Sequence, residues 1–136
     1  MRVNPRSVDD YSEGTNCNKF IYVTEGKGMC VSLEKERLMV GSGMLIYVPQ
    51  EEKMKIEWSE DANIIFLDFV VEDSQTSELL KFDNNTQLVF SQTPPRIREI
   101  FEHMARFFPS VERGTLLRCQ KLFFDLLYEF SLFIPK

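Results

Sequence analysis

Short apolar runs alternate with polar or glycine-containing turns between Lys19 and Val71. The runs are rich in Val, Ile, Phe, Tyr and Met, and their length of about five to eight residues is typical of β-strands. They predict about six strands, and because the turns between them are short, we expect a meander of antiparallel hairpins. The predicted turns are Gly26–Gly28, Glu34–Lys35, Gly41–Gly43, Gln50–Glu52 and Ser59–Asp61.

Alternation within these runs indicates which side chains face the core. Met54, Ile56 and Trp58 share one face of their strand, and charged residues occupy the other face. Because side chains of a strand point alternately to its two faces, these three are predicted to point inward. The runs Phe20–Thr24 and Ile64–Val71 are apolar on both faces, so both are expected to be covered on both sides.

The hydrophobic period changes to that of a helix after Pro94 and Pro95. A first helix is predicted to end at Pro109, with one apolar stripe made of Ile97, Ile100, Phe101, Met104, Phe107 and Phe108. A second helix is expected from about Gly114 to Ile134. Its apolar face is wider than one contact requires, which favours a homodimer through Leu122, Phe123, Leu126 and Phe130. The alternative is that both helices bury their apolar faces against the strands.

The remaining segments are polar. Residues 1–18 have no hydrophobic period and are interpreted as a flexible N-terminal arm. Residues 72–86 are polar and acidic and predict a connecting loop, followed by a further strand over 87–91. The expected organisation is therefore an arm at 1–18, a β-barrel at 19–92 and a helical dimerisation segment at 93–136.

Composition narrows the class of protein. With 43% hydrophobic residues in 136, the chain can bury the core of one domain. A net charge of -5 without a Lys/Arg run excludes the basic surface of a nucleic-acid binder. Three cysteines without a C-x-x-C spacing argue against a disulfide framework and a zinc site. With neither a signal peptide nor a run long enough to span a bilayer, we expect a soluble, cytoplasmic protein with no membrane partner.

One glycine-to-proline spacing points to a particular fold. Gly43 is followed by five residues and then Pro49, and Met54 comes five positions further on, while Gly26 closes an earlier strand. This spacing resembles that of cupins, which implies a small antiparallel jelly-roll-like barrel. In that family the position of Met54 holds a histidine metal ligand, and Lys19 stands where a ligand glutamate is expected. A protonated ammonium cannot bind a metal, and a thioether is too soft for iron, manganese or zinc, so we expect no metal and no cofactor.

A wider pattern extends the resemblance. The stretch F-I-Y-V-T-E-G-K-G-M from Phe20, the stretch G-M-L-I-Y-V-P from Gly43 and two C-terminal amphipathic helices resemble the N-terminal sensor and dimerisation domain of AraC-type transcription regulators. The resemblance implies a mainly β fold, a cupin barrel followed by two α-helices, with a small-molecule effector and a homodimer but no enzymatic activity. It also implies that DNA is contacted only through a helix-turn-helix domain that is absent from this chain.

Candidate ligand-binding residues lie on the faces predicted to line the barrel: Ile21, Val23, Tyr47, Met54, Ile56, Trp58 and Phe66. These residues form either a ligand pocket or the packed interior of a small barrel. Asp68 shares a strand face with Ile64 and Phe66, and it is expected to point outward because charged residues are seldom buried. His103, the single histidine, is expected at the surface of the first helix. The alternative functions are a stand-alone metal-free cupin enzyme of the sugar isomerase kind, with Asp68, Lys19 and tyrosines as its polar groups, and a small-molecule-binding cupin.

Overall fold

The computed structural model describes residues 2–3, 8–11, 17–32, 37–59, 61–69, 86–107 and 113–133. The chain divides into two compact units. The barrel unit comprises residues 1–70 and 82–93, and the helical unit comprises residues 71–81 and 94–136. Each unit is described by itself below.

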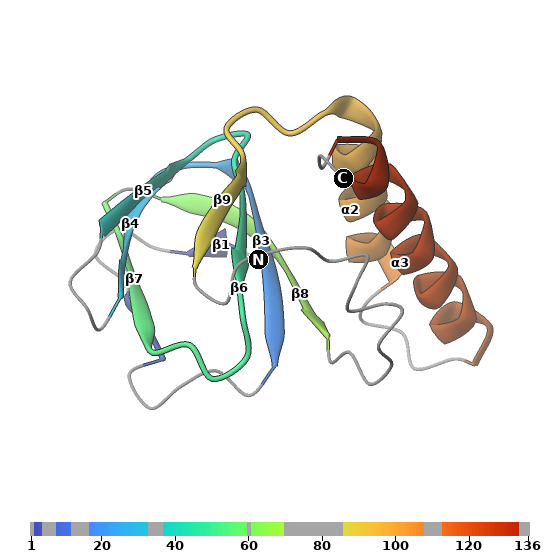
Figure 1. Ribbon diagram of the computed structural model, residues 1–136, viewed down its shortest axis with the longest axis horizontal. Coiled ribbons are helices and arrows are strands. Elements are labelled where there is room, and N and C mark those ends of the chain that lie inside the picture. The colour runs from blue at the N-terminus through green and yellow to red at the C-terminus, as the bar shows by residue number, and fades with distance from the viewer. Residues whose placement is uncertain are drawn as a thin grey trace. The chain divides into compact units, whose positions relative to one another are not determined.

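The barrel unit is built from two antiparallel sheets (Figure 1). One sheet has five strands in the order β1-β8-β3-β6-β9, and the other has four in the order β2-β7-β4-β5. The strands are β1 (Arg2–Val3), β2 (Val8–Tyr11), β3 (Asn18–Glu25), β4 (Lys27–Ser32), β5 (Arg37–Gly41), β6 (Leu45–Val48), β7 (Met54–Trp58), β8 (Ala62–Phe69) and β9 (Gln87–Phe90).

The strand order is that of a jelly roll. Among the described strands, only β4 and β5 are neighbours both in sequence and in a sheet, and every other pair joins strands distant in sequence. The predicted fold class, a small antiparallel jelly-roll-like barrel followed by two helices, is confirmed. The predicted meander is wrong, because turn signals and alternation are local and do not determine which strands pair.

Two strands lie within the segment expected to be a flexible arm. Strand β1 pairs with β8 at Ala62 and Asn63, and β2 pairs with β7 along Met54 to Glu57. Both are edge strands of their sheets. An edge strand needs only backbone hydrogen bonds on one side, so it can form without the apolar alternation by which strands are recognised in a sequence. Residues 4–7 and 12–16 of the arm lie outside the described residues.

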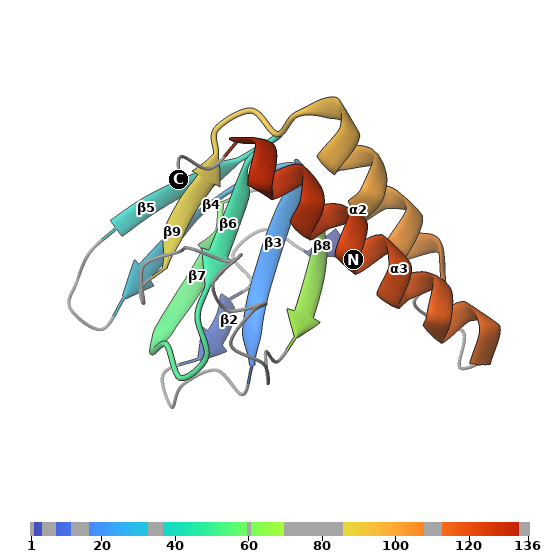
Figure 2. The ribbon, with the colours of Figure 1, turned by 45° about the vertical axis from the view of Figure 1, so that its right-hand side comes forward.

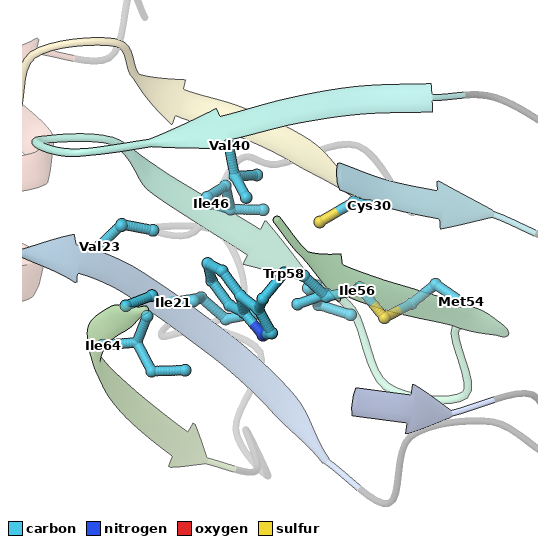
Figure 3. Close-up of a cluster of buried hydrophobic side chains, with 11 residues drawn as sticks. Ile21, Val23, Cys30, Val40, Ile46, Met54, Ile56, Trp58 and Ile64 are labelled. Atoms are coloured by element: carbon cyan, nitrogen blue, oxygen red, sulfur yellow. The ribbon is translucent and has the colours of Figure 1, made fainter. Parts of the chain in front are cut away.

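The core of the barrel is a single cluster of buried side chains from both sheets (Figure 3). Trp58 lies at its centre and is 1% exposed. A Cβ at Gly28 on the neighbouring strand would lie 2.8 Å from Cε3 of Trp58, so the indole requires a glycine there. The cluster comprises Ile21, Val23, Cys30, Val40, Ile46, Val48, Met54, Ile56, Trp58, Ala62 and Ile64. The inward orientation predicted for β7 is therefore confirmed.

Backbone conformation explains why glycine occupies the two glycine positions of the cupin-like spacing. Gly26 has a φ of 110° and Gly43 a φ of 85°, a region that residues with a Cβ seldom adopt. At Gly26 a Cβ would also lie 2.4 Å from Cβ of Ala62. Each glycine ends a strand in a tight turn, so the spacing reflects the geometry of the barrel.

The helical unit holds α2 (Pro95–Phe107) and α3 (Arg113–Phe133), which lie side by side (Figures 1 and 2). Their bounds agree closely with the predicted helices. In α2 the predicted stripe is buried at Ile97, Ile100, Phe101 and Met104, whereas Phe108 and the side chain of Phe107 lie outside the described residues. Nε of Arg96 on α2 lies 3.6 Å from Oε1 of Glu129 on α3. Neither described helix is long and apolar enough to cross a membrane. The alternative that both helices bury their apolar faces against the strands stays a prediction.

Candidate functional site

A charged pair faces into the barrel at one end of β3. Lys19 is the cross-strand partner of Val48 on β6 and of Asp68 on β8. Cross-strand partners lie on the same face of a sheet, and Val48 belongs to the core cluster, so Lys19 and Asp68 are both on the inward face. Nζ of Lys19 donates a hydrogen bond of 2.9 Å to Oδ1 of Asp68.

The two members of the pair differ in burial. Lys19 is 8% exposed, whereas the side chain of Asp68 is 51% exposed. Nζ of Lys19 also lies 5.9 Å from the ring centroid of Phe66, which packs against the core cluster. Burial of an ammonium is costly, and both the carboxylate and the electron-rich aromatic face offset that cost. The result is a buried cation whose partner is in contact with water.

Asp68 is exposed and ion-paired, as expected of an outward residue, although the face of β8 that carries it is the inward one. The residue faces inward with Ile64 and Phe66, but it lies next to the last residue of β8. At a strand end, an inward side chain can remain half in water, so the rule against buried charges does not determine its orientation there.

Cys17 adjoins the charged pair. Burial raises the pKa of its thiol above the ordinary value of 9.0, the Asp68 carboxylate raises it further, and Lys19 acts in the opposite direction. The thiol is therefore protonated near neutral pH and is a weak nucleophile. The sequence did not predict that Cys17 lies beside Lys19 and Asp68. Cys17 is in a polar stretch without alternating apolar residues, so nothing there indicated its position.

Tyr47 does not face the barrel interior. Its neighbours on β6, Ile46 and Val48, belong to the core cluster, so Tyr47 points to the opposite face. Its ring lies 5.5 Å from that of Phe20, and its hydroxyl donates to Oδ1 of Asn18 at 3.3 Å. Burial raises the pKa of the Tyr47 phenol. Its assignment to the lumen is wrong because β6 is apolar on both faces, so its sequence does not distinguish them.

The other predicted lumen residues lie together. Ile21, Val23, Met54, Ile56 and Trp58 are all members of the core cluster, and Phe66 packs against it as a partly buried residue. The five cluster members point toward one another in the interior of the barrel (Figure 3). Their role in ligand binding stays a prediction.

Side chains that could bind a metal ion do not gather at one place in the part of the chain that the structure describes. No three His, Cys, Asp or Glu side chains form a group that could hold a metal ion there. His103 is exposed on α2, as expected.

The residues predicted for a subunit interface are mostly buried within the single chain. Leu122, Leu126 and Phe130 are buried, and Phe123 is half-buried. Among the side chains of α3 that the structure describes, from Gln120 to Leu132, the large exposed apolar ones are instead Phe124, Tyr128 and Leu132, at 61%, 63% and 61% exposure. They follow one another at intervals of four residues and so lie along one face of the helix. Because apolar residues occur around most of α3, the sequence did not show which of its faces is exposed.

Comparison with known proteins gives a likeness of fold. No family model matches the chain, and no curated protein matches it. Among solved structures, ToxT from Vibrio cholerae O395 bound to (E)-4-(8-methylnaphthalen-1-yl)but-3-enoic acid has a TM-score of 0.63 and 11% identity, covering 97% of this chain and 52% of ToxT. A second structure of ToxT from the same strain has a TM-score of 0.60 and 11% identity. That match covers 99% of this chain and 54% of ToxT.

A shorter likeness is to a DUF861 family protein from Thermotoga maritima, with a TM-score of 0.46 and 17% identity over 51% of this chain and 75% of that one. The chain spans about half the length of ToxT. At such identities, the shared feature of this chain and ToxT is a fold, which here is a cupin-like barrel followed by two helices.

Proposed function

We propose that this chain is the ligand-sensing and dimerisation domain of an AraC-like transcription regulator. The observation that carries the proposal is the buried ammonium of Lys19, which lies on the inward face of the barrel beside Asp68 and next to the apolar core cluster. Support also comes from the likeness to ToxT, an AraC-family regulator, which extends over 97% of this chain. DNA is then contacted through a separate helix-turn-helix domain of the parent protein.

The proposed effector is a carboxylic acid with an apolar body. The acid in the ToxT structure has this chemistry, with a carboxylate joined to a methylnaphthalene. In this chain, Lys19 supplies the complementary charge, and Phe66 and Met54 supply adaptable apolar surface. Asp68 is half exposed, so its carboxylate can turn into water when the ligand carboxylate replaces it beside Lys19.

The titratable side chains near the barrel interior favour ligand binding over catalysis. Lys19 already donates to a carboxylate, and burial and Asp68 hold the Cys17 thiol protonated. His103 is on α2, in the other unit of the chain. We therefore propose no reaction and no cofactor. A product formed from the bound acid would favour the alternative of a metal-free cupin enzyme.

Titration of (E)-4-(8-methylnaphthalen-1-yl)but-3-enoic acid into the chain, followed by calorimetry, tests the proposal. The variant is Lys19→Met, and the matched control is Lys55→Met, since Lys55 also pairs with a carboxylate, that of Glu57 at 3.1 Å, but is 45% exposed. Loss of a charge-assisted hydrogen bond costs about 1.5–3 kcal/mol, so Lys19→Met should weaken binding roughly 10- to 100-fold.

Lys55→Met should bind like the wild type. Equal loss in the two variants, or binding that does not respond to Lys19→Met, would contradict the proposed site. An absence of binding by the wild type would contradict the proposed ligand class.

A further inference from the structure

The hydroxyl of Thr86 is buried and makes no hydrogen bond to the residues that the structure describes. Among those residues, its Oγ1 is the one buried side-chain nitrogen or oxygen without a partner. Thr86 directly precedes β9 and belongs to the barrel unit. Burial of a hydroxyl without a hydrogen bond costs free energy, so few such groups persist in folded proteins without a role.

Strand register places Thr86 on the inward face of the barrel. Strands β6 and β9 pair so that Ile46 lies opposite Leu88. Two residues further along the same register, Thr86 comes to lie beside Val48. Ile46 and Val48 both belong to the core cluster, so Thr86 shares their inward face.

Thr86 and the charged pair lie in one row across the five-stranded sheet. Val48 is also the cross-strand partner of Lys19, and Lys19 is in turn the partner of Asp68. The row crosses β9, β6, β3 and β8, which follow one another in the sheet (Figure 2), with Thr86, Val48, Lys19 and Asp68. A buried hydroxyl and a buried ammonium therefore lie on either side of an apolar residue on the same face.

Leu88 shows that the inward face of β9 is in contact with water. It shares that face with Thr86, and it is 38% exposed, whereas Ile46 opposite it is fully buried. Strand β9 is also an edge strand of its sheet. An apolar ligand can therefore contact this face at Leu88, two residues from Thr86.

The spacing of the row sets the length of a ligand that contacts both ends. Neighbouring strands lie about 4.8 Å apart, so Thr86 and Lys19, two strands apart, are separated by about 10 Å. A ligand that accepts hydrogen bonds from both needs polar groups at about this separation. At about 1.2 Å per bond of an extended chain, the two polar ends of ω-hydroxyoctanoic acid lie about 11 Å apart.

We propose that Thr86 is a specificity-determining residue of the effector site, and that the effector carries a hydroxyl or carbonyl group at the end opposite its carboxylate. The Thr86 hydroxyl donates to that second group, Lys19 binds the carboxylate, and the apolar chain between them crosses Val48. This inference rests on the proposed function and narrows its ligand class to acids with two polar ends.

The state of the hydroxyl is tested without a ligand, by thermal unfolding of Thr86→Val. The variant replaces the hydroxyl with a methyl group and keeps the branched shape. The matched control is Thr93→Val, because the hydroxyl of the buried Thr93 donates to the carbonyl of Gly43 at 2.8 Å.

The two valine variants should shift the unfolding midpoint in opposite directions. Thr86→Val removes a buried group that has no hydrogen bond, so we expect the midpoint to rise by roughly 2–6 °C. Thr93→Val leaves the chain without an existing hydrogen bond and should lower the midpoint. An unchanged or lower midpoint in Thr86→Val would overturn the inference, because the hydroxyl would then already have a partner within the chain.

The choice of ligand is tested by calorimetry with octanoic acid and ω-hydroxyoctanoic acid. The wild type should bind the ω-hydroxy acid about tenfold more tightly than octanoic acid, because its hydroxyl accepts from Thr86. In Thr86→Val this preference should be lost, and in Thr86→Ser, which keeps a hydroxyl, it should remain. As a control of position, α-hydroxyoctanoic acid should bind the wild type no better than octanoic acid.

Failure of this inference differs from failure of the proposed function. If octanoic acid or the naphthalenyl butenoic acid binds but the ω-hydroxyl adds nothing, the role of Thr86 is wrong and the proposed function stands. A preference that persists in Thr86→Val also overturns that role. If none of these acids binds the wild type, the proposed ligand class is wrong and the role of Thr86 is wrong with it.

Discussion

The Lys19 ammonium and the Asp68 carboxylate share one hydrogen bond, but the two groups differ in burial, so the loss of either should affect stability differently. Lys19 is buried, whereas half of the Asp68 side chain is in water. Removal of the carboxylate takes a charge-assisted hydrogen bond from the buried ammonium, whereas removal of the ammonium leaves a carboxylate that water can solvate. Replacement of a buried charge by an apolar group of similar size is often neutral or stabilising.

We therefore expect Asp68→Ala to lower the free energy of unfolding by roughly 1–3 kcal/mol. Lys19→Met should change it by less than about 1 kcal/mol in either direction. Urea denaturation of both variants measures the asymmetry. A larger loss in Lys19→Met than in Asp68→Ala would mean that the ammonium is held by interactions other than this pair.

At the same scale, the sequence predicted side chains well where a strand has one apolar face. Met54, Ile56 and Trp58 alternate with polar residues, and their inward orientation followed from that period. Tyr47 could not be assigned, because each residue of its strand is buried. For Asp68 the strand end mattered more than its charge. The face of Asp68 was not predicted because the sequence does not give the distance of a residue from the end of the barrel.

Among the elements, α3 presents an exposed apolar face whose residues differ from those predicted for the dimer. Phe124, Tyr128 and Leu132 are each more than half exposed. We propose that this face, in place of the buried Leu122, Leu126 and Phe130, meets a second copy of the chain. Tyr128 belongs to a residue type that is enriched among those that dominate the energy of an interface.

Light scattering over a concentration series tests this dimer. The wild type should have twice the monomer mass of 16.0 kDa, and Phe124→Glu should weaken the dimer by about tenfold or more. Ala105→Glu adds the same charge at an exposed position of α2 and should leave the dimer unchanged. A wild type that is monomeric throughout, or a Phe124→Glu variant that associates as well as the wild type, would contradict the proposed interface.

Strands and helices were predicted more reliably than their arrangement. The bounds of α2 and α3 followed from prolines and a helical period, and those of β3 to β9 followed from turns. The pairing of β3 with β8 and of β4 with β7 did not follow, because it depends on contacts distant in sequence. Strands β1 and β2 were missed because polar edge strands carry no apolar alternation.

In the whole molecule, we propose that the barrel binds an effector and that the helices join two copies of the chain. The barrel holds Lys19 on its inward face near the start of β3. The chain spans about half the length of ToxT, so control of DNA belongs to the proposal for the parent protein. Effector binding at the Lys19 end of the barrel is the central claim.

Mapping of backbone amide chemical shifts during titration with the naphthalenyl butenoic acid tests that claim most directly. We expect saturable changes that are largest at Asn18, Lys19 and the end of β8 from Phe66 to Phe69. Binding whose shift changes are confined to the exposed face of α3, or a titration that leaves the barrel amides unchanged, would contradict it.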